Sequence, residues 1–282
     1  MPELPEVENI RIGLEKYLKG HSIKSVEVLN RRIFQGDGKK LIDAKFESAE
    51  RFGKMIAINF NNGFSLLAHV KLTGQFIYRG PNLPNPPELS VKVTDGLGGK
   101  HTHVIFHLNR GGVLYYNDIR KFGWIKVVET KKLKNEAVSK LGPEPLKDLT
   151  LNLFTKTLSS SKRAVKVILM DQSKISGIGN IYANDALWLS QIAPTRSSQS
   201  LSEKEIKTLY KAIKKVLREG LKQGGASELA FVTPDGTEGK YQDHTLVYGR
   251  EGELCKRCKK AKIKKIFLSG RGTYFCPNCQ YD

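Results

Sequence analysis

The first 254 residues of this 282-residue sequence contain no cysteine, so no disulfide can form outside the last 28 residues. The sequence also lacks any apolar run approaching the roughly 18 residues of a membrane-spanning helix, and no signal peptide precedes the first predicted helix. These absences argue against a membrane-spanning or secreted protein. We therefore expect a soluble protein that works in the cytoplasm.

Acidic side chains are scarce relative to basic ones, since 28 Asp and Glu stand against 47 Lys and Arg, a formal net charge of +19. A charge of this size attracts polyanions. Nucleic acid is the leading candidate partner and a membrane surface the second, although a ribosomal or merely basic surface gives the same total. With 39% hydrophobic residues, the chain can bury real cores, and its length suits two domains plus a small module.

The four cysteines form two CxxC pairs, Cys255 with Cys258 and Cys276 with Cys279, separated by 17 residues. This spacing is typical of tetrahedral Zn²⁺. The alternatives are two short-range disulfides, which a cytosolic location disfavours, or an iron site. Four ligands leave no open position for water, so we predict a structural Zn²⁺ site. The same tail carries eight basic residues and one acidic residue, which favours a contact with a polyanion.

Changes in periodicity divide the chain. Residues 5–19 predict an amphipathic helix, and the runs KSVEVLNRR, KMIAINF, FSLLAHV, HVIFHL and GVLYYND predict short strands with hairpin turns at NNG and NRGG. GPEPL at 142–146 marks a boundary, after which helical patterns follow, most clearly at 203–223. A long, Gly-rich segment comes next, and we expect it to be a mobile loop.

The N-terminus carries a possible catalytic group. Once Met1 is removed, Pro2 offers a secondary amine, and an α-amine has a pKa of about 8 against about 10.4 for lysine, so more of it is unprotonated at neutral pH. Its adduct with an aldehyde carbon is an iminium ion, an electron sink that eases elimination. Glu3 and Glu6 stand close enough to transfer protons, and Lys54 could donate to a sugar oxygen or leaving group.

Five stretches occur here in one order: PELPEVE, RFGK, NDIRKFG, DQ followed by GIGNIYAN, and GRGTYFCPNCQ. Together they closely resemble the formamidopyrimidine-DNA glycosylase family, from Pro2 to Gln280. The resemblance implies an α+β protein: an N-terminal antiparallel β-sandwich with a leading helix (1–130), a helix–two-turn–helix domain (131–225), a lesion-capping loop (226–244) and a C-terminal zinc-finger hairpin (245–282).

The activity that the resemblance implies belongs to base excision repair. It would be a bifunctional DNA glycosylase and AP lyase that removes 8-oxoguanine and formamidopyrimidines from duplex DNA and also acts on abasic sites. One structural Zn²⁺ and a monomeric state are implied. Pro2 would be the nucleophile, Glu3 the general acid and base, Glu6 its support and Lys54 an assisting group, with Arg271 placed beside them in the catalytic set.

The resemblance also implies a set of DNA contacts. Three residues would fill the space left by the extruded base, namely Leu72, Arg120 and Phe122. Backbone contacts are implied for five more, namely His69, His103, Lys166, Asn180 and Arg271. By this resemblance, Arg120 would supply fixed donors for the unpaired cytosine, whereas Phe122 would stack and wedge.

The sequence departs from the family pattern at four places. Leu72 stands where methionine is common, and Thr102 where aspartate is common. The segment ELSVKVTDGLGG before His101 is longer than usual. The loop after Gly224 and Gly225 reads ASELA and lacks the usual arginine, which bears on lesion preference more than on catalysis.

Two other functions are considered. An endonuclease VIII-type glycosylase for oxidised pyrimidines shares the proline, glutamates and zinc hairpin, but typically begins PEGPE where this chain reads PELPE. A zinc-containing DNA-binding protein without activity would need the basic tail but would gain nothing from Pro2, Glu3 and Lys54 together.

Overall fold

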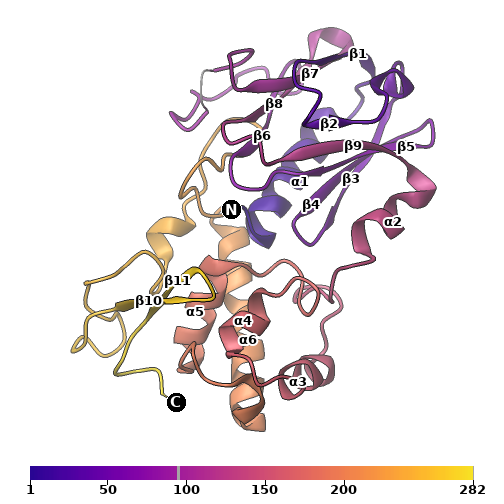
Figure 1. The fold of residues 1–282 in the computed structure, drawn as a ribbon. Coiled ribbons are helices and arrows are strands. Elements are labelled where there is room, and N and C mark those ends of the chain that lie inside the picture. Colours follow the sequence, from indigo (N-terminus) through magenta and orange to yellow (C-terminus); the bar gives the residue numbers. More distant parts are fainter. Residues whose placement is uncertain (94–95, 282) are drawn as a thin grey trace. The chain divides into compact units, whose positions relative to one another are not determined.

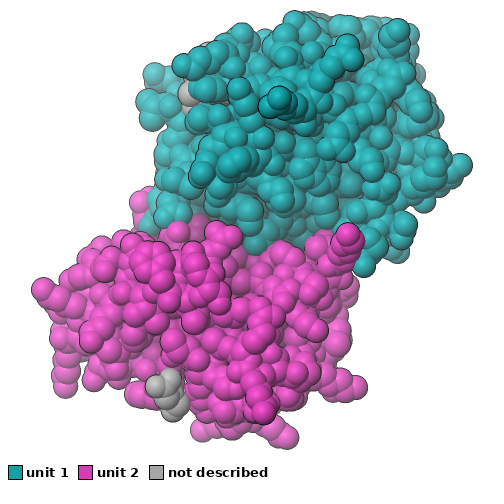
Figure 2. Space-filling view, in the orientation of Figure 1, with its two compact units in different colours: residues 1–139, 221–242 teal, residues 140–220, 243–282 magenta. Residues whose placement is uncertain are grey.

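The computed structural model describes residues 1–93 and 96–281. These residues form two compact units (Figure 2). Unit 1 comprises residues 1–139 and 221–242, and unit 2 comprises residues 140–220 and 243–282. Within the described ranges, no helix is both long and apolar enough to cross a bilayer.

Unit 1 begins with helix α1, Leu4–Leu18, which confirms the predicted N-terminal helix. Glu3 is the N-cap residue and Pro5 lies in the first turn, where its missing N–H costs no intrahelical bond. Residues three or four positions apart form the buried stripe, including Val7, Ile10 and Leu14. The helix therefore starts at a defined residue and buries one face.

Two sheets follow (Figure 1). The four-stranded sheet has the order β1-β7-β8-β6, with bounds Ile23–Val28, Thr102–Leu108, Val113–Asp118 and Gly74–Arg79. The five-stranded sheet has the order β2-β9-β5-β4-β3, with bounds Phe34–Gln35, Trp124–Glu129, Phe64–His69, Met55–Phe60 and Phe46–Phe52. Strand β2 pairs with β9 in parallel, and the other strand pairs of both sheets are antiparallel.

One apolar core joins α1 to both sheets, which confirms a β-sandwich with a leading helix. Leu14 of α1, Ile58 of the five-stranded sheet and Phe106 of the four-stranded sheet are each at most 1% exposed. Helix α2, Thr130–Val138, packs Leu133 and Ala137 against a second apolar cluster on the five-stranded sheet. Burial on this scale fixes the strand ends from which the loops of the site project.

Unit 2 contains the remaining α-helices and a two-stranded hairpin. The helices are α3 Leu151–Ser159, α4 Val165–Met170, α5 Asn180–Ser190 and α6 Glu203–Lys222, whose last two residues belong to unit 1. The hairpin pairs β10, Lys264–Leu268, with β11, Arg271–Phe275. Across both units, the described residues also include four short 3₁₀ turns: η1 Gly38–Leu41, η2 Asn109–Gly111, η3 Ser198–Ser200 and η4 Tyr241–His244.

The segment before His101, which the sequence analysis expects to be longer than usual, runs from Glu88 to Gly99, between β6 and β7. Two of its residues, 94 and 95, lie outside the described residues. The described part contains no helix or strand.

Candidate functional site

Residues 2–7, which follow the exposed Met1, are buried. Pro2 is buried, and Glu3 and Glu6 are only 2% and 1% exposed. The backbone N–H of Glu3 donates to Glu6 Oε2 at 2.7 Å, and the backbone N–H of Ala226 donates to Glu6 Oε1 at 2.7 Å. One buried carboxylate thus joins the start of α1 to the loop that follows α6.

This contact requires glycine on the loop side. Gly225 has φ +86°, a left-handed conformation that side chains disfavour, and a Cβ there would lie 2.9 Å from Glu6 Cγ. The sequence analysis assigns Glu6 a supporting role, and these contacts show which groups it holds. Pro2 and Glu3 are oriented by the same helix start.

Lys54 lies close enough to His69 for its charge to affect the pKa of the imidazole. Lys54 is 5% exposed, in the turn between β3 and β4, and His69 ends β5. Burial lowers the pKa of His69 to about 3, and the charges of Lys71 and Lys54 add to this effect. The backbone N–H of Lys71 donates to His69 Nδ1 at 3.1 Å, so the neutral imidazole accepts there. His69 therefore supports the loop that begins at residue 70.

Asp118 ties together the two loops that carry the predicted void-filling residues. Its carboxylate is fully buried at the end of β8. Oδ1 accepts from the Thr73 hydroxyl and from the backbone N–H of Arg120 at 3.2 Å, and Oδ2 accepts from the backbone N–H of Gly123 at 2.7 Å. Arg120 N–H also donates to Thr73 Oγ1 at 3.0 Å. One anion therefore fixes the loop containing Leu72 relative to the loop containing Arg120 and Phe122.

The tips of these loops face solvent. Phe122 is 56% exposed, and the Arg120 guanidinium carbon lies 5.1 Å from the centre of its ring. Leu72 is half-buried. An exposed phenylalanine on an anchored turn is a common mark of a binding surface, because its burial must come from a partner.

Two buried residues underlie this pair of loops. His103 is 3% exposed and its Nε2–H donates to the backbone oxygen of Asp118 at 2.8 Å. The Tyr116 hydroxyl is buried and has no hydrogen-bond partner within residues 1–93 and 96–281. A Cβ at Gly74 or Gly123 would lie 2.5 Å or 1.9 Å from that hydroxyl, so both loops need glycine where they join their strands. The predicted contact of His103 with DNA stays a prediction.

In unit 2, a second exposed arginine follows the tight turn of the hairpin. Ser269 and Gly270 have φ of 47° and 72°, and Arg271 comes next and is exposed. Lys166 is only 1% exposed, and its Nζ donates to Gly272 O at 3.0 Å and to Thr273 Oγ1 at 2.7 Å. Asn180 Nδ2 donates to the same Gly272 oxygen at 3.0 Å. The structure thus brings Lys166, Asn180 and Arg271 together.

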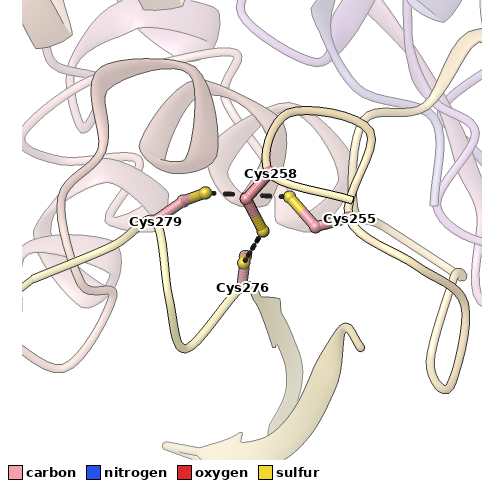
Figure 3. A group of neighbouring side chains, drawn as sticks. All are labelled: Cys255, Cys258, Cys276 and Cys279. Carbon is pink, nitrogen blue, oxygen red and sulfur yellow. Dashed lines mark hydrogen bonds between the residues drawn. The ribbon is translucent and has the colours of Figure 1, made fainter. Parts of the chain in front are cut away.

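The four cysteines converge as predicted (Figure 3). Their sulfurs lie within 4.8 Å of one another, and the thiols are not in disulfides. The Sγ separations are 3.9 Å for Cys255 and Cys279 and 3.8 Å for Cys258 and Cys276. Tetrahedral thiolates at about 2.3 Å from zinc lie about 3.8 Å apart, so the donor set fits this ion. Backbone N–H groups of Ala261 and Lys260 lower the pKa of Cys258 to about 6, which favours the thiolate.

Helix α5 holds the cysteine module in unit 2. The Asp185 carboxylate is fully buried and accepts from the backbone N–H groups of Leu246, Val247 and Tyr248. The Trp188 indole N–H donates to Cys255 Sγ at 3.3 Å. No local pattern in the sequence indicates these partners.

Three sequence models of known domains match nearly the whole chain. The N-terminal domain of formamidopyrimidine-DNA glycosylase matches residues 1–125, and its H2TH domain matches residues 141–231. A zinc finger found in FPG and IleRS matches residues 252–280. The chain belongs to the formamidopyrimidine-DNA glycosylase family. This membership confirms the resemblance drawn from the motifs.

Known members of the family are similar over the full length. Formamidopyrimidine-DNA glycosylase of Lactiplantibacillus plantarum is 40% identical, with 98% of each chain covered. Lactococcus lactis Fpg (MutM) in complex with DNA containing N7-benzyl-Fapy-dG has a TM-score of 0.88 and 34% identity, with both chains fully covered. The same L. lactis protein with abasic-site DNA has a TM-score of 0.87 and 34% identity, covering 99% of this chain and 100% of that one.

Sequence reasoning missed the residues that support the site of this family member. It singled out Leu72, Arg120 and Phe122 but not Asp118 or Thr73, which hold their loops. The available signal was the aspartate directly before the turn in NDIRKFG, a residue type that accepts backbone N–H bonds in turns. Its partner Thr73 is 45 residues away, and no local pattern indicates that pairing.

Proposed function

We propose that this protein is a bifunctional DNA glycosylase and AP lyase that excises oxidised purines, 8-oxoguanine and formamidopyrimidines, from duplex DNA. The observation that carries the proposal is the burial of Pro2, Glu3 and Glu6 at the start of α1. There, the residue that follows Met1 is a proline beside two carboxylates, one of which is anchored by backbone N–H groups on both oxygens. The bond from the Glu3 N–H to Glu6 is the capping box of an ordinary helix start, and the bond from the Ala226 N–H adds a contact 220 residues away that helix capping does not require.

The chemistry follows from the amine. With Met1 removed, the Pro2 nitrogen attacks the anomeric carbon of the damaged nucleotide, the bond to the base breaks, and the base leaves with a proton. The product is an iminium ion, in which the sugar has opened and the nitrogen carries the positive charge. Glu3 acts as general acid and base on the sugar, and Lys54 assists near the sugar or base.

Elimination completes the reaction. The iminium cation draws electrons from the neighbouring C–H bond, so a base removes that proton and the 3′ phosphate leaves. A second elimination releases the 5′ phosphate, and water then hydrolyses the adduct and frees Pro2. The result is a one-nucleotide gap. Glu6 holds Glu3 and the Gly225 loop in place throughout these steps.

The exposed loop residues of unit 1 suit a duplex from which one base has been extruded. Removing a base from the stack costs a few kcal/mol, and side chains that fill the space offset that cost. We assign this role to Leu72, Arg120 and Phe122. Arg120 would donate to the unpaired cytosine while Phe122 wedges beside it.

Unit 2 supplies a second DNA contact in this proposal. The four cysteines would hold one structural Zn²⁺, which stabilises the hairpin that presents Arg271 toward phosphate or the reacting nucleotide. Lys166 and Asn180 position that turn, and His69 and His103 would contribute on unit 1. We expect a monomer that acts on chromosomal DNA in the bacterial cytoplasm.

Borohydride trapping tests the proposal directly. On a duplex with 8-oxoguanine opposite cytosine, the wild-type protein should give a covalent adduct after reduction, because borohydride reduces the iminium bond to a stable amine. Pro2→Gly should lower adduct formation by roughly 100-fold or more, since it removes the secondary amine. Intact mass of the N-terminus must show that Met1 is absent in both proteins.

Pro5→Ala is the matched control, because Pro5 also lies in the first turn of α1 but carries no free amine. It should keep the adduct. DNA binding without any adduct in the wild-type protein would instead support a zinc-containing DNA-binding protein. A duplex with an oxidised pyrimidine distinguishes the endonuclease VIII-type activity, for which that substrate should be trapped faster than 8-oxoguanine.

A further inference from the structure

The longer segment before His101 packs against the loop that follows α6, and both belong to unit 1 (Figure 1). The backbone N–H of Ser90 donates to Gly236 O at 3.0 Å, and its hydroxyl donates to Glu238 Oε1 at 2.5 Å. Lys92 Nζ donates to Glu238 Oε2 at 2.5 Å and to the backbone oxygen of Ser227. Two neighbouring polar residues therefore hold both ends of the loop.

Apolar contacts reinforce this pairing. Val93 and Val232 are 7% and 1% exposed and share a buried cluster with Ile77 of β6, against which Leu89 packs. A Cβ at Gly236, which has φ +91°, would lie 2.4 Å from Leu89 Cδ2. The loop and the segment thus fit closely, and the fit depends on a residue without a side chain.

Gln75 of β6 connects the two segments. Its Nε2 donates to Lys92 O at 2.8 Å and to Ala230 O at 2.6 Å, and the residue is 2% exposed. Because Gln75 stands on β6, whose residues Phe76 and Tyr78 belong to the apolar core, it anchors both the segment and the loop to the sandwich. The polar contacts are therefore not confined to the surface.

The opposite side of the loop is held by its own residues and by α1. Ser227 Oγ–H donates to Phe231 O at 2.7 Å and accepts from Gly239 N–H at 2.9 Å. Ala226 N–H donates to Glu6, as described above. The loop that the sequence predicts to be mobile is thus bonded on two sides, to the catalytic helix start and to the segment at 89–93.

We propose that residues 89–93 form a brace that fixes the loop at 226–239 and sets how efficiently the damaged base is bound for excision, with Lys92 and Glu238 as positioning residues. The inference rests on the proposed function. A loop that must cover an extruded base loses conformational entropy when it orders, and contacts that order it beforehand reduce that cost. This loop lacks the arginine common in the family, and the brace supplies a lysine from another part of the chain.

If the brace acts in this way, its loss should slow base excision but not strand cleavage at an abasic site. Base excision requires the loop to cover a base, whereas strand cleavage at a preformed abasic site involves no base. Lys92→Ala and Glu238→Gln should each slow single-turnover excision of 8-oxoguanine by about five- to tenfold, as expected for the loss of a partly buried, charge-assisted pair. Cleavage of abasic DNA should stay within about twofold of the wild-type rate.

Conservative and matched variants distinguish a loss of loop positioning from a general loss of folding. Lys92→Arg keeps a cation that can donate to Glu238 and Ser227, so it should retain most of the excision rate. Glu88→Gln changes an exposed residue at the start of the segment, and Lys100→Ala an exposed residue directly after it, and both should leave both rates unchanged. Amide hydrogen exchange at 226–239 should become faster in Lys92→Ala and not in Lys100→Ala.

An equal loss of excision and abasic cleavage would overturn the brace, and so would unchanged rates for both brace variants or unchanged exchange in the loop. These outcomes leave the proposed function standing if the wild-type protein excises 8-oxoguanine and is trapped through Pro2. A wild-type protein that excises no oxidised purine would overturn the proposed function, and the role of the brace in excision with it.

Discussion

Two exposed arginines, one in each unit, are presented by tight turns that the protein holds in opposite ways. Arg120 precedes Lys121 at φ 56°, and Arg271 follows Ser269 and Gly270, which also have positive φ. The Arg120 turn is fixed by a buried anion, Asp118, which accepts backbone N–H groups. The turn before Arg271 is fixed by a buried cation, Lys166, which donates to a backbone oxygen.

The two turns also differ in the secondary structure that carries them. Asp118 ends a strand of a four-stranded sheet whose core is shared with α1 and the second sheet. The Arg271 turn ends a two-stranded hairpin, which is marginal by itself in water. That hairpin depends on the cysteine cluster, Lys166 and α5. The comparison predicts that metal removal disturbs the position of Arg271 and leaves that of Arg120 unchanged, since only the Arg271 turn depends on the metal.

Cys276→Ser should have the largest effect. With one thiolate missing from the tetrahedral set, the hairpin loses its main support and Arg271 its fixed position. Affinity for a lesion duplex should fall on the order of 100-fold, measured by fluorescence anisotropy. A strong chelator added to the wild-type protein should reproduce the loss, and added Zn²⁺ should reverse it.

The two tryptophans report on the two units separately. Trp188 contacts Cys255, whereas Trp124 lies in β9 of unit 1, with its ring centre 6.2 Å from that of His69. In a Trp188→Phe background, Trp124 fluorescence should be unchanged by Cys276→Ser. A change in Trp124 emission, or full retention of duplex affinity without metal, would contradict the separation of the two supports.

Asp118→Asn should have the next largest effect. The amide cannot accept on both sides as the carboxylate does, so Thr73, Arg120 and Gly123 lose part of their shared support. We expect excision opposite cytosine to fall by roughly one to two orders of magnitude, because small misplacements of site residues are costly. Single-turnover kinetics would measure it.

The control for this change is Asp43→Asn, at a residue whose side chain is 72% exposed. A double variant tests the cause. If Asp118 acts by placing Arg120, then Asp118→Asn should add little to Arg120→Ala. Fully additive losses would show that the carboxylate acts by another route.

Helices and strands were predicted correctly where a local sequence pattern decides the structure. The helices at 5–19 and 203–223 are confirmed to within a residue because an amphipathic stripe and its end signals are local. Strands β2, β3, β6 and β9 were missed. FESAERF carries three charged residues in seven, and GQFIYR is buried at five consecutive positions, so neither alternates between polar and apolar residues.

The site shows the same division. The cysteine cluster was predictable because CxxC spacing has a direct geometric meaning. The catalytic roles of Pro2 and Glu3 stay predictions. The pairing of Lys92 with Glu238 spans 146 residues, and that of Thr73 with Asp118 spans 45. Such pairs depend on how distant segments fold together, so a single sequence gives no periodic sign of them.

His69 offers the smallest test of how the unit 1 loops are supported. Its imidazole accepts the Lys71 N–H and has a pKa lowered to about 3 by burial and by Lys71 and Lys54. The unfolded chain binds the proton near pH 6.5. Between about pH 6.5 and pH 3 the unfolded state therefore holds more protons at this residue, so its contribution to stability is lost as the pH falls. Above pH 6.5 the contribution is constant.

Nuclear magnetic resonance of the His69 ring measures this pKa directly. Its Cε1 proton should show one constant chemical shift from pH 8 to pH 5, whereas a histidine in an unfolded peptide titrates near pH 6.5. His69→Asn keeps an acceptor for the Lys71 N–H but removes the titrating group. It should therefore flatten the pH dependence of unfolding between pH 6.5 and pH 5. A His69 ring that titrates above pH 5 would mean that the loop containing Leu72 rests on a hydrated, chargeable support rather than a buried, neutral one.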